Sequence, residues 1–183
     1  MHDLAARIDR LESIDAIRQL VSYYGMCIDR RDMDALTKLF VPEVRVSRTE
    51  SGHEALRALL DSQMYQFTTS IHFVGNHVID FIDTDHAEGK QYSKVEHEYG
   101  DQWVMMGIEY WDRYERRDGR WLFTGRQVRS FYACDIMERP NGPNKVRWNV
   151  SGPAEVPMRY DTWQAFWADE QARQKASEYL LQR

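Results

Sequence analysis

The spacing of apolar residues changes once along the chain, from a helical period to an alternating one. Over residues 4–28, apolar side chains recur every three or four positions, which places them on one face of a helix. Ser13 interrupts this run and is a typical N-cap residue, so we expect a second helical segment to begin near Ile14. Asp32 is expected to cap a short helix over residues 33–40.

Between the first helices and the alternating region, the sequence predicts two shorter elements. We expect a short strand over residues 44–47 and a third helix over 54–64. From residue 72 the chain is rich in Val, Ile, Phe, Tyr and Trp, and turn-forming residues separate four extended stretches. The Asp118-Gly119 pair predicts a tight hairpin between the last two. The four predicted strands are residues 72–82, 89–99, 103–116 and 121–136.

Helices followed by antiparallel strands indicate an α+β fold, with the helices packed on one curved sheet. We expect a cone-shaped space between them, and a domain that spans residues 1–137. Residues 138–157 hold four of the five prolines and are expected to form an extended loop. Residues 162–181 are expected to form a terminal helix, so residues 138–183 are treated as a C-terminal extension. The apolar side of that helix would carry Trp163, Phe166 and Trp167.

Charge and cysteine content narrow the class of protein. The formal net charge is −5, without a block of Lys and Arg, which argues against nucleic-acid binding. The chain has no apolar run of 18 residues and no signal-peptide core, so we expect neither membrane insertion nor export. Cys27 and Cys134 lack ligand-like spacing and are expected to be reduced thiols in the cytoplasm.

Aromatic residues make up 13% of the chain, including six Trp and ten Tyr. They are explained either by a heavy aromatic core, which composition alone favours, or by an aromatic-lined cavity for a flat ligand. Glycine-rich phosphate loops and serine-nucleophile motifs are absent. His72 and His77 lie an odd number of positions apart on a strand, so we expect them on opposite faces and predict no metal site and no cofactor.

Asp29 and His72 stand out by their context. Asp29 ends a core-facing helix, where the helix dipole disfavours a carboxylate. By itself it is equally well explained as a cap for the following turn, and His72 by itself as an ordinary core histidine. Together they fit a general base, because a carboxylate that accepts from one imidazole nitrogen orients the ring and makes it more basic.

Several segments resemble the SnoaL-like branch of the nuclear transport factor 2 superfamily. The AIRQLVSYYGMCIDRRD stretch from Ala16 and LTKLF from Leu36 resemble its first helices. IHFVGN from Ile71 resembles its first long strand, and DRYERRDGRWLF from Asp112 resembles its hairpin. The resemblance covers residues 8–136. It implies a cone-shaped α+β barrel around one deep apolar pocket, and relatives such as hexachlorocyclohexane dehydrochlorinase, scytalone dehydratase and bile-acid 7α-dehydratase, which are cofactor-free lyases.

The resemblance also implies roles for four residues. His72 would remove a proton from carbon, Asp29 would orient it, and Tyr24 and Arg129 would stabilise developing negative charge. Arg126 competes with Arg129, because it lies on the other face of the strand. The expected substrate is a hydrophobic aromatic or polycyclic molecule that loses water, halide or formaldehyde. The expected pocket walls are Tyr65, Phe67, Trp103, Met105, Tyr110 and Phe131.

Other functions in this superfamily remain open at this stage. A non-catalytic binding or scaffold subunit, such as the small subunit of ring-hydroxylating dioxygenases, would use the same cone without turnover. A cofactor-free isomerase or cyclase would use the same base and give a product of unchanged mass. The resemblance also implies a homo-oligomer, with a trimer favoured over a dimer, in which residues 138–183 cover the pocket or pack on a neighbouring subunit.

Overall fold

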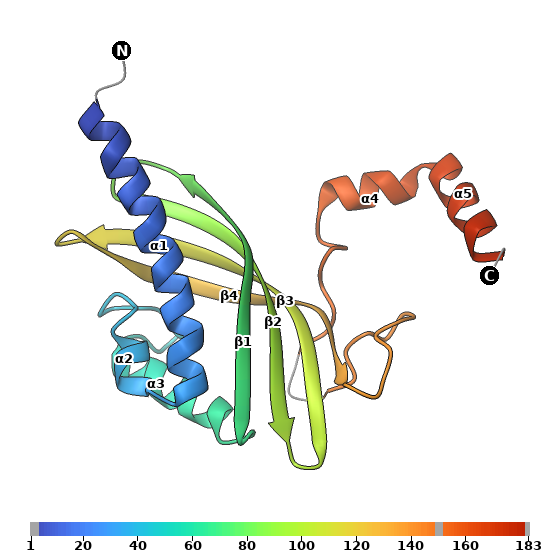
Figure 1. Cartoon of the computed structure of the whole chain (residues 1–183), viewed down its shortest axis with the longest axis horizontal. Coiled ribbons are helices and arrows are strands. Elements are labelled where there is room, and N and C mark those ends of the chain that lie inside the picture. Colours follow the sequence, from blue (N-terminus) through green and yellow to red (C-terminus); the bar gives the residue numbers. More distant parts are fainter. Residues whose placement is uncertain (1–3, 149–151, 182–183) are drawn as a thin grey trace.

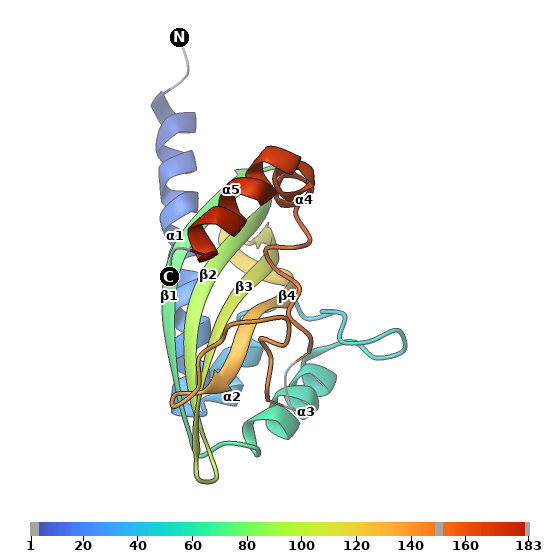
Figure 2. The same ribbon diagram turned by 90° about the vertical axis from the view of Figure 1, so that its right-hand side faces the viewer.

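A computed structural model describes residues 4–148 and 152–181. Four antiparallel strands form one curved sheet in the order β1-β2-β3-β4, and the sheet is not closed. The long helix α1 runs along the inner face of the sheet, with α2 and α3 near its C-terminal end (Figures 1 and 2). The elements are α1 (Leu4–Arg30), α2 (Met33–Thr37), α3 (His53–Met64), β1 (Thr69–Phe81), β2 (His86–Tyr99), β3 (Gln102–Arg117), β4 (Arg120–Asp135), α4 (Asp161–Ala168) and α5 (Glu170–Leu181).

The four predicted strands and the α+β order are confirmed, and the expected break in the first helix is wrong. Helix α1 continues through Ser13, which is buried, whereas Leu4, Ile8 and Leu11 before it stay exposed. Asp32 caps α2 as expected, accepting from the backbone N–H of Ala35 at 3.0 Å. Residues 44–47 do not form a strand: Arg45 makes only an isolated bridge to Ser51.

The core fills the space between the three N-terminal helices and the inner face of the sheet. Side chains from both layers are excluded from solvent there, including Ile17, Leu36 and Phe123, each 0% exposed. None of the helices in the described ranges is long and apolar enough to cross a membrane.

The free edge of β4 is covered by three segments from outside the sheet. The chain around Phe40 forms a parallel bridge to Phe123, Val146 bridges Ala133, and Ala154 bridges Ser130. Covering an edge strand in this way blocks pairing with other sheets. It also brings the C-terminal extension back onto the domain.

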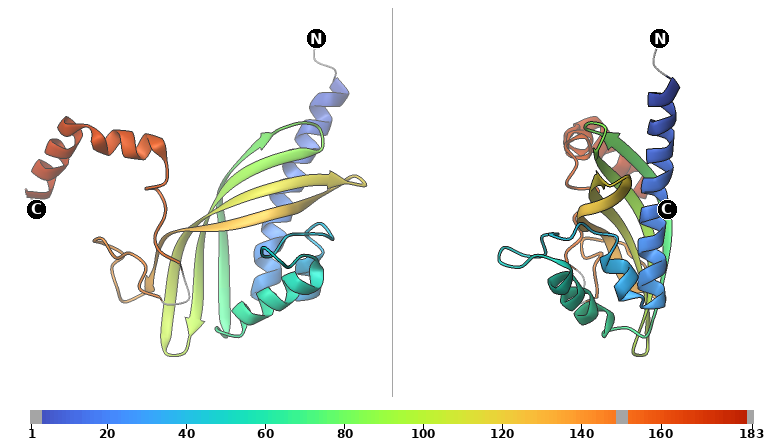
Figure 3. Two further views of the ribbon diagram at one scale, coloured as in Figure 1. Left: turned by 180° about the vertical axis from the view of Figure 1, so that it is seen from behind. Right: turned by 90° about the vertical axis from the view of Figure 1, so that its left-hand side faces the viewer.

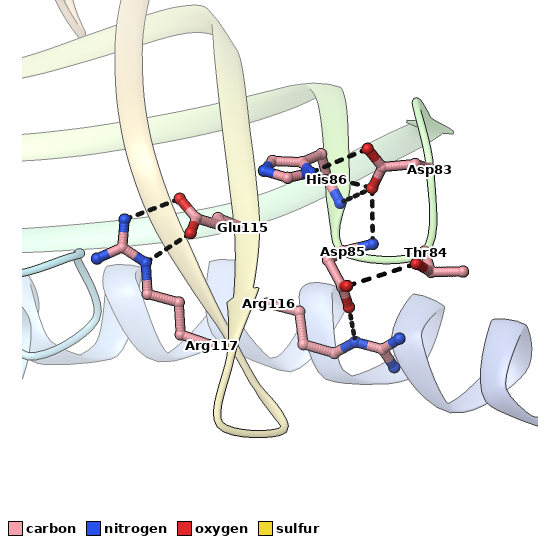
Figure 4. A network of polar contacts seen from close by, with 7 residues as sticks. All are labelled: Asp83, Thr84, Asp85, His86, Glu115, Arg116 and Arg117. Atoms are coloured by element: carbon pink, nitrogen blue, oxygen red, sulfur yellow. Dashed lines mark hydrogen bonds and ion pairs between the residues drawn. The ribbon is translucent and has the colours of Figure 1, made fainter.

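An ionic network ties together the hairpin tips at the end of the sheet far from the end of α1. Arg116 donates to Asp85 at 2.8 Å (Figure 4). It also donates to Asp9 at 2.6 Å, which links both hairpins to the start of α1. At the same end, Arg117 pairs with Glu115 and Glu43. The hairpin between β3 and β4 turns at Asp118 and Gly119, where φ is 50° and 73°.

The C-terminal helix is divided in two, in contrast to the single helix expected. Asp169 adopts an extended conformation, with ψ of 121°, and separates α4 from α5. Together they form an arm, defined here as residues 161–181, that stands away from the sheet (Figures 1 and 3). The aromatic side of α4 therefore stays exposed, with Phe166 60% and Trp167 36% accessible.

Candidate active site

The end of α1 is fixed by a Schellman motif. The backbone N–H of Arg31 donates to Ile28, and that of Asp32 donates to Cys27. Arg31 adopts the left-handed conformation at φ 58°, where glycine is usual. Its guanidinium donates to the Ser70 hydroxyl at 2.6 Å and to the Phe67 carbonyl at 2.9 Å. These bonds hold the beginning of β1 against the last turn of α1.

This clamp places Asp29 beside His72. Oδ1 of Asp29 lies 2.7 Å from Nδ1 of His72, and Oδ2 accepts from the His72 backbone N–H at 2.9 Å. Both carboxylate oxygens of Asp29 therefore contact His72 of β1, and Asp29 does not cap the turn that follows α1. The side chain of His72 is 6% exposed and that of Asp29 is 24% exposed. Within residues 4–148 and 152–181, Nε2 of His72 has no hydrogen-bond partner.

A second histidine, His97, lies next to this pair, and the sequence pattern did not single it out. The ring centroids of His72 and His97 are 6.0 Å apart. Burial lowers the pKa of His97 to about 3, and the nearby His72 and Arg31 add to that effect, so the ring is neutral. Its Nδ1 is buried without a partner among the described residues. Phe67 and Trp148 flank the His97 ring at 4.1 and 5.4 Å between centroids.

A cluster around Arg126 lies on the same face of the sheet. Arg126 makes a two-pronged ion pair with Asp112, both bonds 2.8 Å, and both side chains are almost fully buried. Its guanidinium also stacks over Tyr24 and Tyr110, 4.2 and 4.0 Å from the ring centroids. Burial raises the pKa of both phenols, so both keep their protons.

Tyr110 links this cluster to the dyad electrostatically. Burial is the main cause that raises the pKa of Tyr110; the nearby Tyr24, Asp112 and, least of all, Asp29 add to it, and Arg126 opposes it. Tyr24 and Tyr110 pack edge to face, 5.9 Å between ring centroids. The inner face thus presents the His72–Asp29 pair and the neutral His97 at one side, and two protonated phenols with a fixed guanidinium at the other.

The expectation that His72 and His77 face opposite sides is wrong. An irregularity in the pairing of β1 with β2 between Val74 and His77 changes the alternation, so both rings face inward. They belong to separate networks, because His77 contacts the hydroxyl of Tyr114 at 3.2 Å and that hydroxyl donates to Asp112. No group of three potential metal-ligating His, Cys, Asp or Glu side chains occurs in the described ranges.

The expected partnership of Arg129 with Tyr24 is also wrong. Arg129 pairs with Glu109 across the strands, on the face opposite Arg126, because side chains alternate along β4. Its guanidinium donates to Glu155 of the C-terminal extension at 2.8 Å. Arg126 occupies the inward position that the sequence analysis gave to Arg129.

The six residues expected to line the pocket do not lie together: two are on the inner side of the sheet, three are on its outer face and one points to solvent. Phe67 and Tyr110 are buried on the inner side. Tyr65 is 84% exposed, because it immediately follows α3 and points to solvent. Trp103 and Met105 alternate with inward Val104 and lie on the outer face. Phe131 packs on the outward Tyr92, at 5.4 Å between centroids.

Two hollows lie along the sheet, and neither is lined by His72 or Asp29. One, of about 640 Å³, is lined by Arg45 and Arg48 from the segment between α2 and α3 and by residues of all four strands, with Asp112 and Arg126 among them. Another, of about 550 Å³, lies on the outer face around Phe73, Tyr92 and Phe131.

The fold and the site define an α+β protein in which an aspartate at the end of the first helix holds a histidine on the inner face of the sheet. A SnoaL-like domain model matches residues 9–127, which is more than half of the chain. The protein therefore belongs to the SnoaL-like family.

Similar proteins cover most of the chain. The gamma-hexachlorocyclohexane dehydrochlorinase of Sphingobium indicum is 27% identical over 135 residues, which span 68% of this chain and 85% of that relative. The solved hexachlorocyclohexane dehydrochlorinase of Novosphingobium barchaimii is 25% identical, with a TM-score of 0.65 over 72% of this chain and 94% of the other. An NTF2-like protein of Novosphingobium aromaticivorans is 26% identical, with a TM-score of 0.58 over 70% and 90%.

Proposed function

We propose that the protein is a cofactor-independent lyase with His72 and Asp29 as its general base. The observation that carries this proposal is the double contact of Asp29 with His72, which leaves Nε2 unpartnered among the described residues. With Nδ1–H donating to the carboxylate, Nε2 holds a free lone pair. That lone pair takes a proton from a carbon of the substrate, and Asp29 stabilises the resulting imidazolium.

In this proposal the leaving group of the substrate lies beside the Arg126 cluster, on the same face of the sheet as His72. Tyr24 and Tyr110 keep their O–H groups, and Arg126 supplies a fixed positive charge. Donors and charge held in a buried site stabilise the negative charge that develops as a leaving group departs. Arg126 therefore takes the role that the sequence analysis gave to Arg129.

The residues beside the base favour an apolar substrate. Phe67 and Trp148 stack around the neutral His97 next to His72, and Trp148 belongs to the C-terminal extension. We propose a hydrophobic aromatic or polycyclic substrate, with the extension covering that end of the site. The names of the dehydrochlorinase relatives support halide elimination as one form of the reaction.

The proposal is tested with a panel of halogenated, hydroxylated and hydroxymethyl-bearing ring compounds. Mass spectrometry identifies a product that has lost hydrogen halide, water or formaldehyde. His72→Gln should reduce turnover by about 10²–10⁴-fold, whereas the exposed His86→Gln should leave it unchanged. A product of unchanged mass would indicate an isomerase or cyclase, and binding without turnover would indicate a scaffold; either result contradicts the proposal.

We further propose that the protein acts in the cytoplasm as a homo-oligomer, with a trimer favoured over a dimer. The free thiols of Cys27 and Cys134 support a reducing compartment. An apolar patch on the outer face, with Phe73 60% and Tyr92 44% exposed, supports self-association, because large exposed apolar patches usually mark interfaces.

A further inference from the structure

The outer face of the sheet contains an apolar hollow that the chain leaves open. We call it the outer hollow; its volume is about 550 Å³. Phe73 and Tyr92 line it and are 60% and 44% exposed. Two lysines, Lys94 and Lys145, also line it, and neither makes an ion pair within the described ranges.

The C-terminal arm has the complementary properties. Phe166 and Trp167 pack on each other at 5.1 Å between centroids, and helix α4 buries no residue. The same helix and its junction with α5 carry three acidic residues and no basic one. Asp161, Asp169 and Glu170 make no ion pairs in the part of the chain that the structure describes. An exposed aromatic helix with acidic ends thus matches an aromatic hollow with two free lysines.

The arm does not reach its own hollow. Tyr160, the residue before α4, donates to the buried Glu109 at 2.5 Å, and Glu155 pairs with Arg129 at 2.8 Å. These contacts anchor the extension on the outer face and fix where α4 begins. From that point α4 and α5 lead away from the sheet (Figures 1 and 3).

We propose that helix α4 of one copy docks its Phe166 and Trp167 into the outer hollow of a second copy. This inference names the contact behind the self-association proposed above and rests on that association. It does not depend on the chemistry at His72. Docking removes two exposed apolar surfaces from water at once, and the acidic ends of α4 meet Lys94 and Lys145 at the rim. The arm and the hollow are different surfaces of the chain. Two copies can therefore exchange arms in a dimer, or each copy can dock its arm into the next copy around a closed ring.

Light scattering on the full-length chain measures the assembly, whose monomer mass is 21.8 kDa. The double variant Phe166→Asp, Trp167→Asp should weaken association at least about tenfold, or about 1.4 kcal/mol. Its control, Ala165→Asp with Gln171→Asp, adds the same charge outside the aromatic pair. In the hollow, Phe73→Asp should also dissociate the assembly, whereas Val78→Asp on the same face of β1 should not.

Exchanging the charges tests the pairing itself. Lys94→Glu should weaken assembly and Asp169→Lys should do the same, and combining them should restore part of the loss. A monomeric wild-type chain would overturn the inference, and so would an assembly that survives the Phe166 and Trp167 or the Phe73 changes. A wild-type chain that assembles through the arm yet turns over no compound of the panel would count against the proposed chemistry alone.

Discussion

The position of the His72 ring is set by the residue that faces it on α1. That residue is Gly25, and a Cβ added there would lie 3.0 Å from the Cβ of His72. Glycine inside a helix costs about 1 kcal/mol relative to alanine. Because Gly25 has no side chain, β1 can approach α1 closely enough for His72 to contact Asp29, although glycine destabilises the helix.

Gly25→Ala separates these two effects. The substitution should leave the free energy of unfolding within about 1 kcal/mol of wild type, because the gain in helix propensity offsets the crowding. It should lower kcat, because β1 must shift and lengthen the contact between His72 and Asp29. Urea unfolding and turnover measured on the same variant check both; unchanged turnover would show that the spacing does not matter.

Arg126 and Arg129 form a matched pair for a second test. Arg126→Ala leaves the fully buried Asp112 without its partner and should cost about 3–5 kcal/mol. Arg129→Ala breaks a partly exposed pair with Glu155 and should cost about 1 kcal/mol or less. Denaturant unfolding measures both. Equal costs would contradict the difference in burial on which their assignment rests.

These residues also show what the sequence could and could not reveal. Asp29 and His72 stood out in the sequence because Asp29 ends an apolar helix and His72 begins an apolar strand, but their contact is known only from the structure. The choice between Arg126 and Arg129 depended on which face of β4 points inward, and pairing irregularities at Gly107 and at Arg113 make that register unreadable from alternation. His97 gave no signal, because its role comes from contacts with Phe67 and Trp148.

At the scale of elements, the junction between α1 and β1 builds the site. Arg31 follows α1 in a left-handed conformation, and its guanidinium donates hydrogen bonds to the Ser70 hydroxyl and the Phe67 carbonyl. Strand limits were predictable to within a few residues, because Gly, Asp and Asn mark the turns. The irregularity in β1 before His77 and the break at Asp169 were not, since both depend on long-range packing.

Two substitutions at Arg31 distinguish the effect of its left-handed backbone from the effect of its side-chain hydrogen bonds to Ser70 and Phe67. Arg31→Gly relieves the left-handed backbone but removes the clamp, whereas Arg31→Ala loses the clamp and keeps the strain. Both should lower kcat, because β1 is no longer held against Asp29, and the alanine variant should be about 1 kcal/mol less stable than the glycine variant. Full turnover in Arg31→Gly would show that the clamp does not position His72.

At the scale of the whole molecule, the buried inner face makes the fold sensitive to acid. Burial is the main cause that lowers the pKa of His97 to about 3 and that of His77 to about 4. Below about pH 6.5 the unfolded chain binds protons at these rings that the folded chain does not bind. Stability is therefore full above pH 6.5 and falls as the pH drops toward these lowered values.

Each of these rings should contribute a slope of up to about 1.4 kcal/mol per pH unit. Urea unfolding between pH 7 and pH 5 should show the loss in wild type and a smaller loss in His97→Gln. The exposed His86→Gln serves as the control and should keep the wild-type slope. A His97→Gln slope equal to that of wild type would contradict the neutral, buried state of His97.

The central claim is that Nε2 of His72, held by Asp29, removes a proton from carbon. It is tested most directly by kcat/KM on one turned-over substrate, with hydrogen and with deuterium at the cleaved C–H bond. Wild type should be slower with deuterium, and His72→Gln should lose about 10²–10⁴-fold. Asp29→Asn should also be impaired, because the amide no longer fixes the Nδ1–H tautomer. Wild-type rates in His72→Gln would contradict the account.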